Sequence, residues 1–135
     1  MSRRSARKNA FCLLFQLGFH EPHEESLVRE IFFSQNPDIS GEDGEFINKI
    51  VDNTLRNIEG IDGEIGSFSK GWTTKRMSRV DLSILRLAVC EMTVIKETPT
   101  SVVINEAVEL AKKYSSDEAP AFINGILGEL SKGEK

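Results

Sequence analysis

The chain has few of the residues that stabilise small secreted domains. Its 135 residues include only two cysteines, Cys12 and Cys90. Two cysteines are too few for a disulfide framework, and both fall within helical patterns. We therefore expect both to be reduced thiols in or near the core.

Long apolar runs are also absent. No run reaches the ~18 apolar residues that a membrane-spanning helix requires. The chain begins with a basic and then an apolar stretch, as a signal peptide does. However, polar residues interrupt the apolar part, and no small-residue cleavage site follows it. The sequence therefore predicts a cytoplasmic protein.

Motifs for catalysis and for metal or nucleotide binding are missing. We find no internal repeat, no segment with strand periodicity, no glycine-rich phosphate loop and no nucleophile elbow. His20 and His23 lie among acidic residues, but Pro22 separates them and no second pair of ligands follows. We therefore expect no metal, no cofactor and no enzymatic activity.

The charge is unevenly distributed along the chain. The net charge is −4, but residues 1–8 contain Arg3, Arg4, Arg7 and Lys8 and no acid, which leaves −8 for the remainder. An acidic body does not attract nucleic acid over its whole surface, whereas a basic segment attached to it can bind nucleic acid locally.

The most apolar stretch is 80–95, and the rest of the chain is organised around it. On a helix, its apolar residues fall on two separate arcs. A helix that is apolar on two sides is packed on two sides, so we expect a central helix. Glu91 falls inside one arc and needs a cation or hydrogen-bond donors. A structural ion pair with Arg76 or Arg79 is the favoured interpretation, and a catalytic acid is the alternative.

Six further segments show helical spacing. They are 5–19, 26–34, 44–58, 61–71, 99–114 and a segment that opens within 115–120. In the second segment we expect Leu27, Val28, Ile31 and Phe32 to face inward, and Asp43 can cap the third. With 39% apolar residues and this length, the pattern predicts one all-α domain.

The first helix has a basic start and an aromatic continuation on one face. Arg3, Arg4, Arg7 and Lys8 fall together there, and Phe11 and Phe15 follow lower down. One interpretation is a wide core stripe with a solvated basic start. The other is a binding surface that takes phosphates at one end and an apolar partner at the other.

Four collinear segments resemble the NusB family of bacterial transcription antitermination factors. They are RRSARKNAFCLLFQL (3–17), W-x-x-x-R with RVDLSILRLAVCEM (72–92), P-x-x-VVINEAVELAKKY (99–114) and FINGIL (122–127). The resemblance spans nearly the whole chain and is weakest from 20 to 60. INEAVELAK is the most specific match.

The resemblance implies seven helices in two small bundles packed on each other, with bounds of about 1–58 and 59–135 in a single domain of residues 1–135. It implies binding of boxA RNA, a short single-stranded signal in ribosomal leader and spacer transcripts. It also implies pairing with NusE, a protein of the small ribosomal subunit, within the antitermination complex of RNA polymerase. Monomers and homodimers both occur in the family, so the oligomeric state is left open.

The resemblance also implies site residues. The expected RNA-binding residues are Arg3, Arg4, Arg7, Lys8, Arg86, Phe122 and Asn124, and the expected partner-binding residues are Phe11, Phe15 and Asp81. Where the family commonly has a polar Gln in the first helix, this chain has Cys12, so an RNA contact from that position is in doubt. Core burial is the alternative role for Phe122, because it lies on an apolar stripe.

Two classes of function follow. The first is a non-enzymatic module that binds RNA and a partner protein. The alternative is a helical protein-interaction module without specific RNA binding, in which the basic start is incidental. NusB-like domains also occur fused to RNA methyltransferases, but these 135 residues contain no cofactor-binding domain, so we expect no such activity.

Overall fold

The computed structural model describes residues 1–69 and 74–133. Within these ranges the chain forms seven α-helices and no strands. The α-helices are α1 (Arg3–Leu17), α2 (Glu25–Ser34), α3 (Gly41–Arg56), α4 (Ile58–Phe68), α5 (Arg79–Cys90), α6 (Thr100–Tyr114) and α7 (Ala119–Gly133). Short 3-10 turns precede α2 (Pro22–Glu24) and α5 (Thr74–Arg76), and a π-helical turn (Glu91–Ile95) extends α5.

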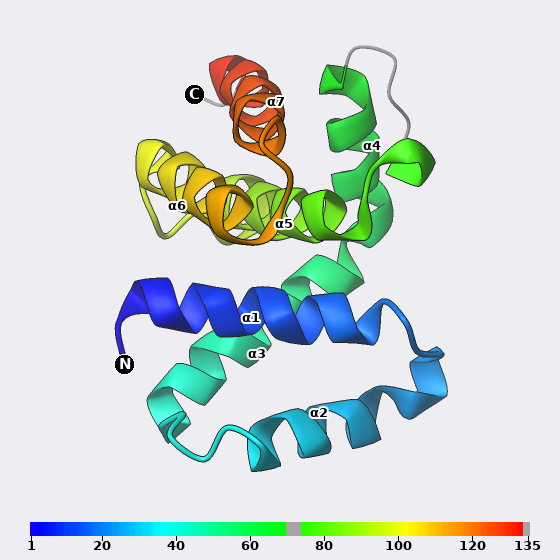
Figure 1. Ribbon diagram of the computed structural model, residues 1–135, viewed down its shortest axis with the longest axis vertical. Helices are drawn as coiled ribbons and strands as arrows, with labels where there is room; N and C mark the ends of the chain where they lie inside the picture. Colours follow the sequence, from blue (N-terminus) through cyan, green and yellow to red (C-terminus); the bar gives the residue numbers. More distant parts are fainter. Residues whose placement is uncertain (70–73, 134–135) are drawn as a thin grey trace.

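The helices form two packed bundles, as predicted. Figure 1 shows α1, α2 and α3 in one half of the molecule and α4, α5, α6 and α7 in the other. Helix α1 lies along the junction, next to α5, and its N-terminus is on the side of α6. The two halves share one continuous hydrophobic core.

The central helix is α5, as the sequence predicts. It packs against α1 and α3 on one side and against α4, α6 and α7 on the other. Its N-cap is Ser78, whose hydroxyl accepts a hydrogen bond of 3.0 Å from the Asp81 backbone N–H. The helix ends through the π-helical turn at Lys96, which has a left-handed φ of 56°. Pro99 then prevents continuation.

Two local predictions are wrong, and a third concerns residues that the structure does not describe. Leu27 and Ile31 of α2 are exposed at 60% and 46%, and Val28 and Phe32 alone make its buried face. A two-residue stripe suffices because α2 packs at the edge of its bundle (Figure 1). The N-cap of α3 is Ser40, which accepts a hydrogen bond from the Asp43 N–H at 3.1 Å. The fourth helix ends at Phe68, and its expected end at Gly71 lies outside the described residues.

The part of the chain that the structure describes contains no helix long and apolar enough to cross a membrane.

Candidate nucleic-acid interface

The first turn of α1 is positively charged. Ser2 caps the helix by accepting a hydrogen bond of 3.0 Å from the Ser5 N–H, and the turn contains no acidic residue. The guanidinium carbon of Arg3 lies 3.9 Å from the centre of the Phe46 ring of α3. A helix N-terminus has a partial positive charge, which adds to that of the side chains. This end of α1 is therefore suited to anions.

A groove runs between α1 and α6. It is lined by Arg4, Ser5, Arg7, Lys8, Glu106, Glu109, Leu110, Lys112, Lys113 and Tyr114. Arg4 donates from Nε to the Glu106 carboxylate, at 2.9 Å to Oε2 and 3.3 Å to Oε1. Lys112 lies 3.6 Å from Glu109, and Lys113 faces the Tyr114 ring. Cations therefore outnumber carboxylates along the groove, although the chain as a whole is acidic.

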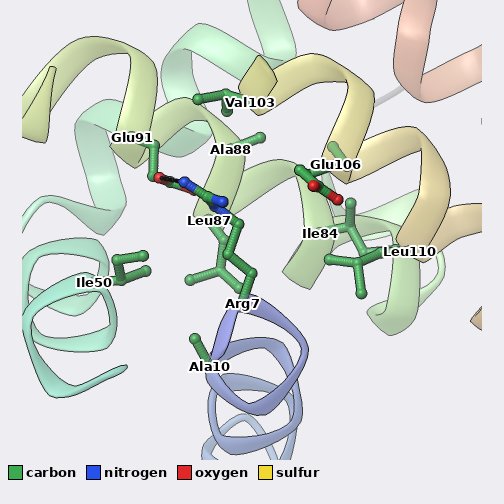
Figure 2. Close-up of a pocket in the computed structure, with 11 residues that line it drawn as sticks. Arg7, Ala10, Ile50, Ile84, Leu87, Ala88, Glu91, Val103, Glu106 and Leu110 are labelled. Carbon is green, nitrogen blue, oxygen red and sulfur yellow. Dashed lines mark hydrogen bonds and ion pairs between the residues drawn. The ribbon is translucent and has the colours of Figure 1, made fainter. Parts of the chain in front are cut away.

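Arg7 turns inward from this groove. Its Nε and Nη2 each donate a hydrogen bond of 2.9 Å to the carboxylate of Glu91, and Nη2 also contacts the hydroxyl of Thr98 at 3.2 Å. Figure 2 shows Arg7 reaching from α1 to Glu91, with Glu106 on its other side. The predicted structural ion pair at Glu91 is confirmed, but its cation is Arg7 and neither Arg76 nor Arg79. A role for Arg7 as an exposed phosphate ligand does not fit this buried position.

Arg86 also has an intramolecular partner. Its Nε and Nη2 donate to the two carboxylate oxygens of Asp62 at 2.8 and 2.7 Å, which ties α5 to α4. Both side chains are about three-quarters buried. The bidentate pair occupies the guanidinium edge that a phosphate would use. RNA contact by Arg86 remains an untested prediction, and this geometry does not favour it.

Aromatic side chains form a row along α1. Phe11 lies 5.4 Å from Tyr114 and 6.1 Å from Phe15, and Phe15 lies 5.1 Å from Phe19, measured between ring centres. Phe11 is only 4% exposed, which agrees with the core-stripe interpretation at this position and does not fit the expected role of Phe11 as a direct partner contact. Phe15 is half-buried and Phe19 is 57% exposed. The accessible end of the row is therefore Phe15 with Phe19.

Arg79 packs against Phe19, at the exposed end of this row. Its guanidinium carbon lies 4.6 Å from the centre of the Phe19 ring, and its Nη1 donates a hydrogen bond of 2.9 Å to the Gly18 carbonyl. The sequence pattern did not indicate a surface role for Phe19, and it offered Arg79 only as a partner for Glu91. Phe19 follows Phe15 by four residues on one helical face, and that spacing could have found it.

Asp81 and Phe122 line a second groove together. Its walls are Arg76, Met77, Ser78, Asp81, Ser116, Glu118, Ala119 and Phe122. Asp81 accepts a short hydrogen bond from the hydroxyl of Ser115, between α6 and α7. Phe122 is half-buried and packs against the core, and Asn124 is exposed. Phe122 therefore packs partly against the core and also lines a groove, and its contact with RNA stays a prediction.

The cysteines are not part of either groove. Burial raises the pKa of the Cys12 thiol, and nearby Lys8 and Lys113 oppose this only partly. Burial likewise raises the pKa of Cys90. Both thiols are therefore neutral and weakly nucleophilic near pH 7. Among the described residues, no three His, Cys, Asp or Glu side chains gather closely enough to hold a metal ion.

Comparison with known proteins gives one consistent result. The model of the NusB family matches residues 4–132. The transcription antitermination protein NusB of Acetivibrio thermocellus is 45% identical over 132 residues, covering 98% of this chain and 90% of that protein. NusB of Natranaerobius thermophilus is 42% identical, covering 97% and 95%.

Solved structures agree with the sequence matches. The NusB structure from T. maritima superposes with a TM-score of 0.88 at 30% identity, covering 98% of this chain and 92% of that one. A chain in a crystal structure of the antitermination factors NusB and NusE with double-stranded RNA gives a TM-score of 0.85 at 28% identity, covering 97% and 96%.

Proposed function

Since this chain belongs to the NusB family of transcription antitermination proteins, we propose that it binds boxA RNA of ribosomal RNA transcripts together with NusE. The protein acts by binding, without catalysis, as part of the antitermination complex of RNA polymerase. It works in the cytoplasm, where bacterial transcripts are made.

One observation supports this proposal most strongly. The fold matches a chain of a NusB–NusE–RNA complex over nearly its whole length. The basic groove between α1 and α6 offers a place for phosphates in an otherwise acidic protein. Phe122, with Asn124 close by on α7, offers an aromatic face and an amide for unpaired bases.

We assign phosphate contacts to Arg3, Arg4 and Lys8 in the first instance. Arg4 is 63% exposed, and Lys8 lines the groove beside it. The NusE surface comprises Phe15 and Asp81, and Phe19 extends it. Phe11 contributes indirectly, because its buried ring supports Phe15 from below.

The test measures RNA binding by fluorescence anisotropy. Labelled boxA RNA from the ribosomal leader of the source organism is titrated with the protein, with and without NusE, and a scrambled RNA is the control. We expect preference for boxA and tighter binding when NusE is present. The same sequence as a duplex is included, because the related complex holds double-stranded RNA. Equal affinity for boxA and scrambled RNA under all conditions would contradict specific RNA binding. It would favour the alternative, a helical protein-interaction module.

A further inference from the structure

We propose that Glu106 is a positioning residue for RNA binding. Its carboxylate holds the guanidinium group of Arg4 by one edge, so that the other edge is presented to an RNA phosphate in the groove between α1 and α6. This inference depends on the proposed RNA binding, and it assigns a role to an acidic residue that would otherwise repel RNA.

The hydrogen bonds of Arg4 determine which donors remain available. Both contacts with Glu106 come from Nε, at 2.9 and 3.3 Å. Neither Nη1 nor Nη2 has a hydrogen-bond partner among the residues that the structure describes. Because arginine has a rigid planar fork of five donors, fixing Nε also fixes the orientation of the two terminal nitrogens. These two nitrogens can bind a phosphate in a bidentate manner.

Glu106 is itself well anchored. Its side chain is 14% exposed, whereas that of Arg4 is 63% exposed. It lies on α6 beside Ala107 and Leu110, and it shares a small pocket with the buried pair of Arg7 and Glu91 (Figure 2). The Glu106 carboxylate is therefore a fixed acceptor. The exposed Arg4 side chain is the longer and more mobile of the two, and the contact with Glu106 restrains its guanidinium group. Restraining a long side chain before binding reduces the entropy that binding must remove.

A simple charge argument predicts the opposite effect. A carboxylate in a phosphate-binding groove repels RNA, so its removal should strengthen binding. The groove contains a natural comparison, because Glu109 lies one turn further along α6. Glu109 contacts Lys112 at 3.6 Å and is 40% exposed. Removing either carboxylate changes the net charge equally, but only Glu106 touches Arg4.

The experiment compares Glu106→Ala, Glu106→Gln and the matched control Glu109→Ala with the wild type. Binding of boxA RNA is measured by anisotropy at fixed salt, and circular dichroism melting confirms that each variant is folded. We expect Glu106→Ala to weaken binding about two- to tenfold, the range expected for ordering one long side chain. Glu109→Ala should bind as tightly as the wild type or more tightly. Glu106→Gln retains an oxygen acceptor for Arg4 Nε, so this variant should bind boxA RNA with wild-type affinity.

A second measurement connects the effect to Arg4. In an Arg4→Ala background, adding Glu106→Ala should weaken binding no further, because there is no guanidinium left to position. Glu106→Ala that binds as tightly as Glu109→Ala would overturn the inference while leaving RNA binding intact. Additive losses in the double variant would also overturn it. If neither the wild type nor Glu109→Ala prefers boxA to scrambled RNA, it is the proposed function that fails.

Discussion

Arg7 and Glu91 lie 84 residues apart in the sequence and form a bidentate ion pair with two hydrogen bonds of 2.9 Å. Their side chains are only 10% and 7% exposed. The pair joins α1 of the first bundle to the π-helical turn that follows α5 in the second. Thr98 accepts a further hydrogen bond from Arg7, so the same contact also secures the connection into α6.

We predict that Glu91→Ala destabilises the fold by ~3–5 kcal/mol, because it leaves the guanidinium of Arg7 buried without its counter-charge. Urea unfolding followed by circular dichroism measures this loss. Affinity for RNA, expressed per folded molecule, should change little. Arg4→Ala is the matched control. It removes an ion pair with an exposed arginine, which contributes only ~0–1 kcal/mol. Equal and small losses for the two variants would contradict a structural role for the buried pair.

The salt dependence of RNA binding tests the groove. Phosphate contacts release counterions, and each contact with a single strand contributes about −0.7 to the slope of log affinity against log salt. Arg4→Ala combined with Lys8→Ala should therefore flatten the slope by about 1.4. Arg86→Ala, whose guanidinium is paired with Asp62, should leave the slope unchanged. If Arg86→Ala alters the slope and the Arg4→Ala, Lys8→Ala double variant does not, the phosphate contacts lie on α5 instead.

The positions of the helices could be predicted well from the sequence. The residues that pack against each helix could be predicted less well. The two apolar arcs of 80–95 identified α5 as central, and in the structure the helix begins after the Ser78 cap and ends at Lys96, ahead of Pro99. These signals are local, because a helix face, a cap and a proline depend on neighbouring residues. The packing of α5 between the two bundles then follows from its having two apolar sides.

Pairing across the fold was not predictable from one sequence. Glu91 clearly needed a cation, but periodicity does not show which of several arginines meets it. The candidates proposed from the sequence were Arg76 and Arg79, whereas the partner is Arg7. For the same reason Phe11 was assigned to a surface, although Tyr114 of α6 covers it. Leu27 was assigned to the core because an apolar residue on a helix does not reveal that its face lies at the edge of the bundle.

A conservative change at Phe122 separates its two roles. Phe122→Leu keeps an apolar side chain against the core and removes the aromatic face that lines the second groove. If the ring stacks on a base, the variant should lose ~1–3 kcal/mol of RNA affinity, and its melting temperature should stay close to that of the wild type. Anisotropy and thermal melting give the two values. An unchanged affinity with a lower melting temperature would assign Phe122 to the core alone.

The partner surface combines an aromatic row with an acidic neighbour. Phe15 lies next to exposed Phe19, and Asp81 lies in the first turn of α5, two residues after Arg79, which contacts Phe19. A partner for this surface should offer an apolar pocket and a basic group. Aromatic anchors dominate interfaces, and their truncation commonly costs ~2 kcal/mol or more. A charge at the rim affects association rate and salt dependence more than affinity.

We therefore predict that Phe15→Asp abolishes pairing with NusE and that Asp81→Lys slows association with a smaller loss of affinity. Both side chains are half-buried, so both variants should remain folded. Asp81→Lys also loses the hydrogen bond from Ser115 and places a positive charge at a helix N-terminus, which should lower stability by ~1–2 kcal/mol. Surface plasmon resonance with NusE gives the two rate constants, and circular dichroism provides the folding control. Because both variants keep the groove between α1 and α6, both should retain weak RNA binding without NusE. Wild-type association kinetics for a folded Phe15→Asp variant would show that NusE docks on another face.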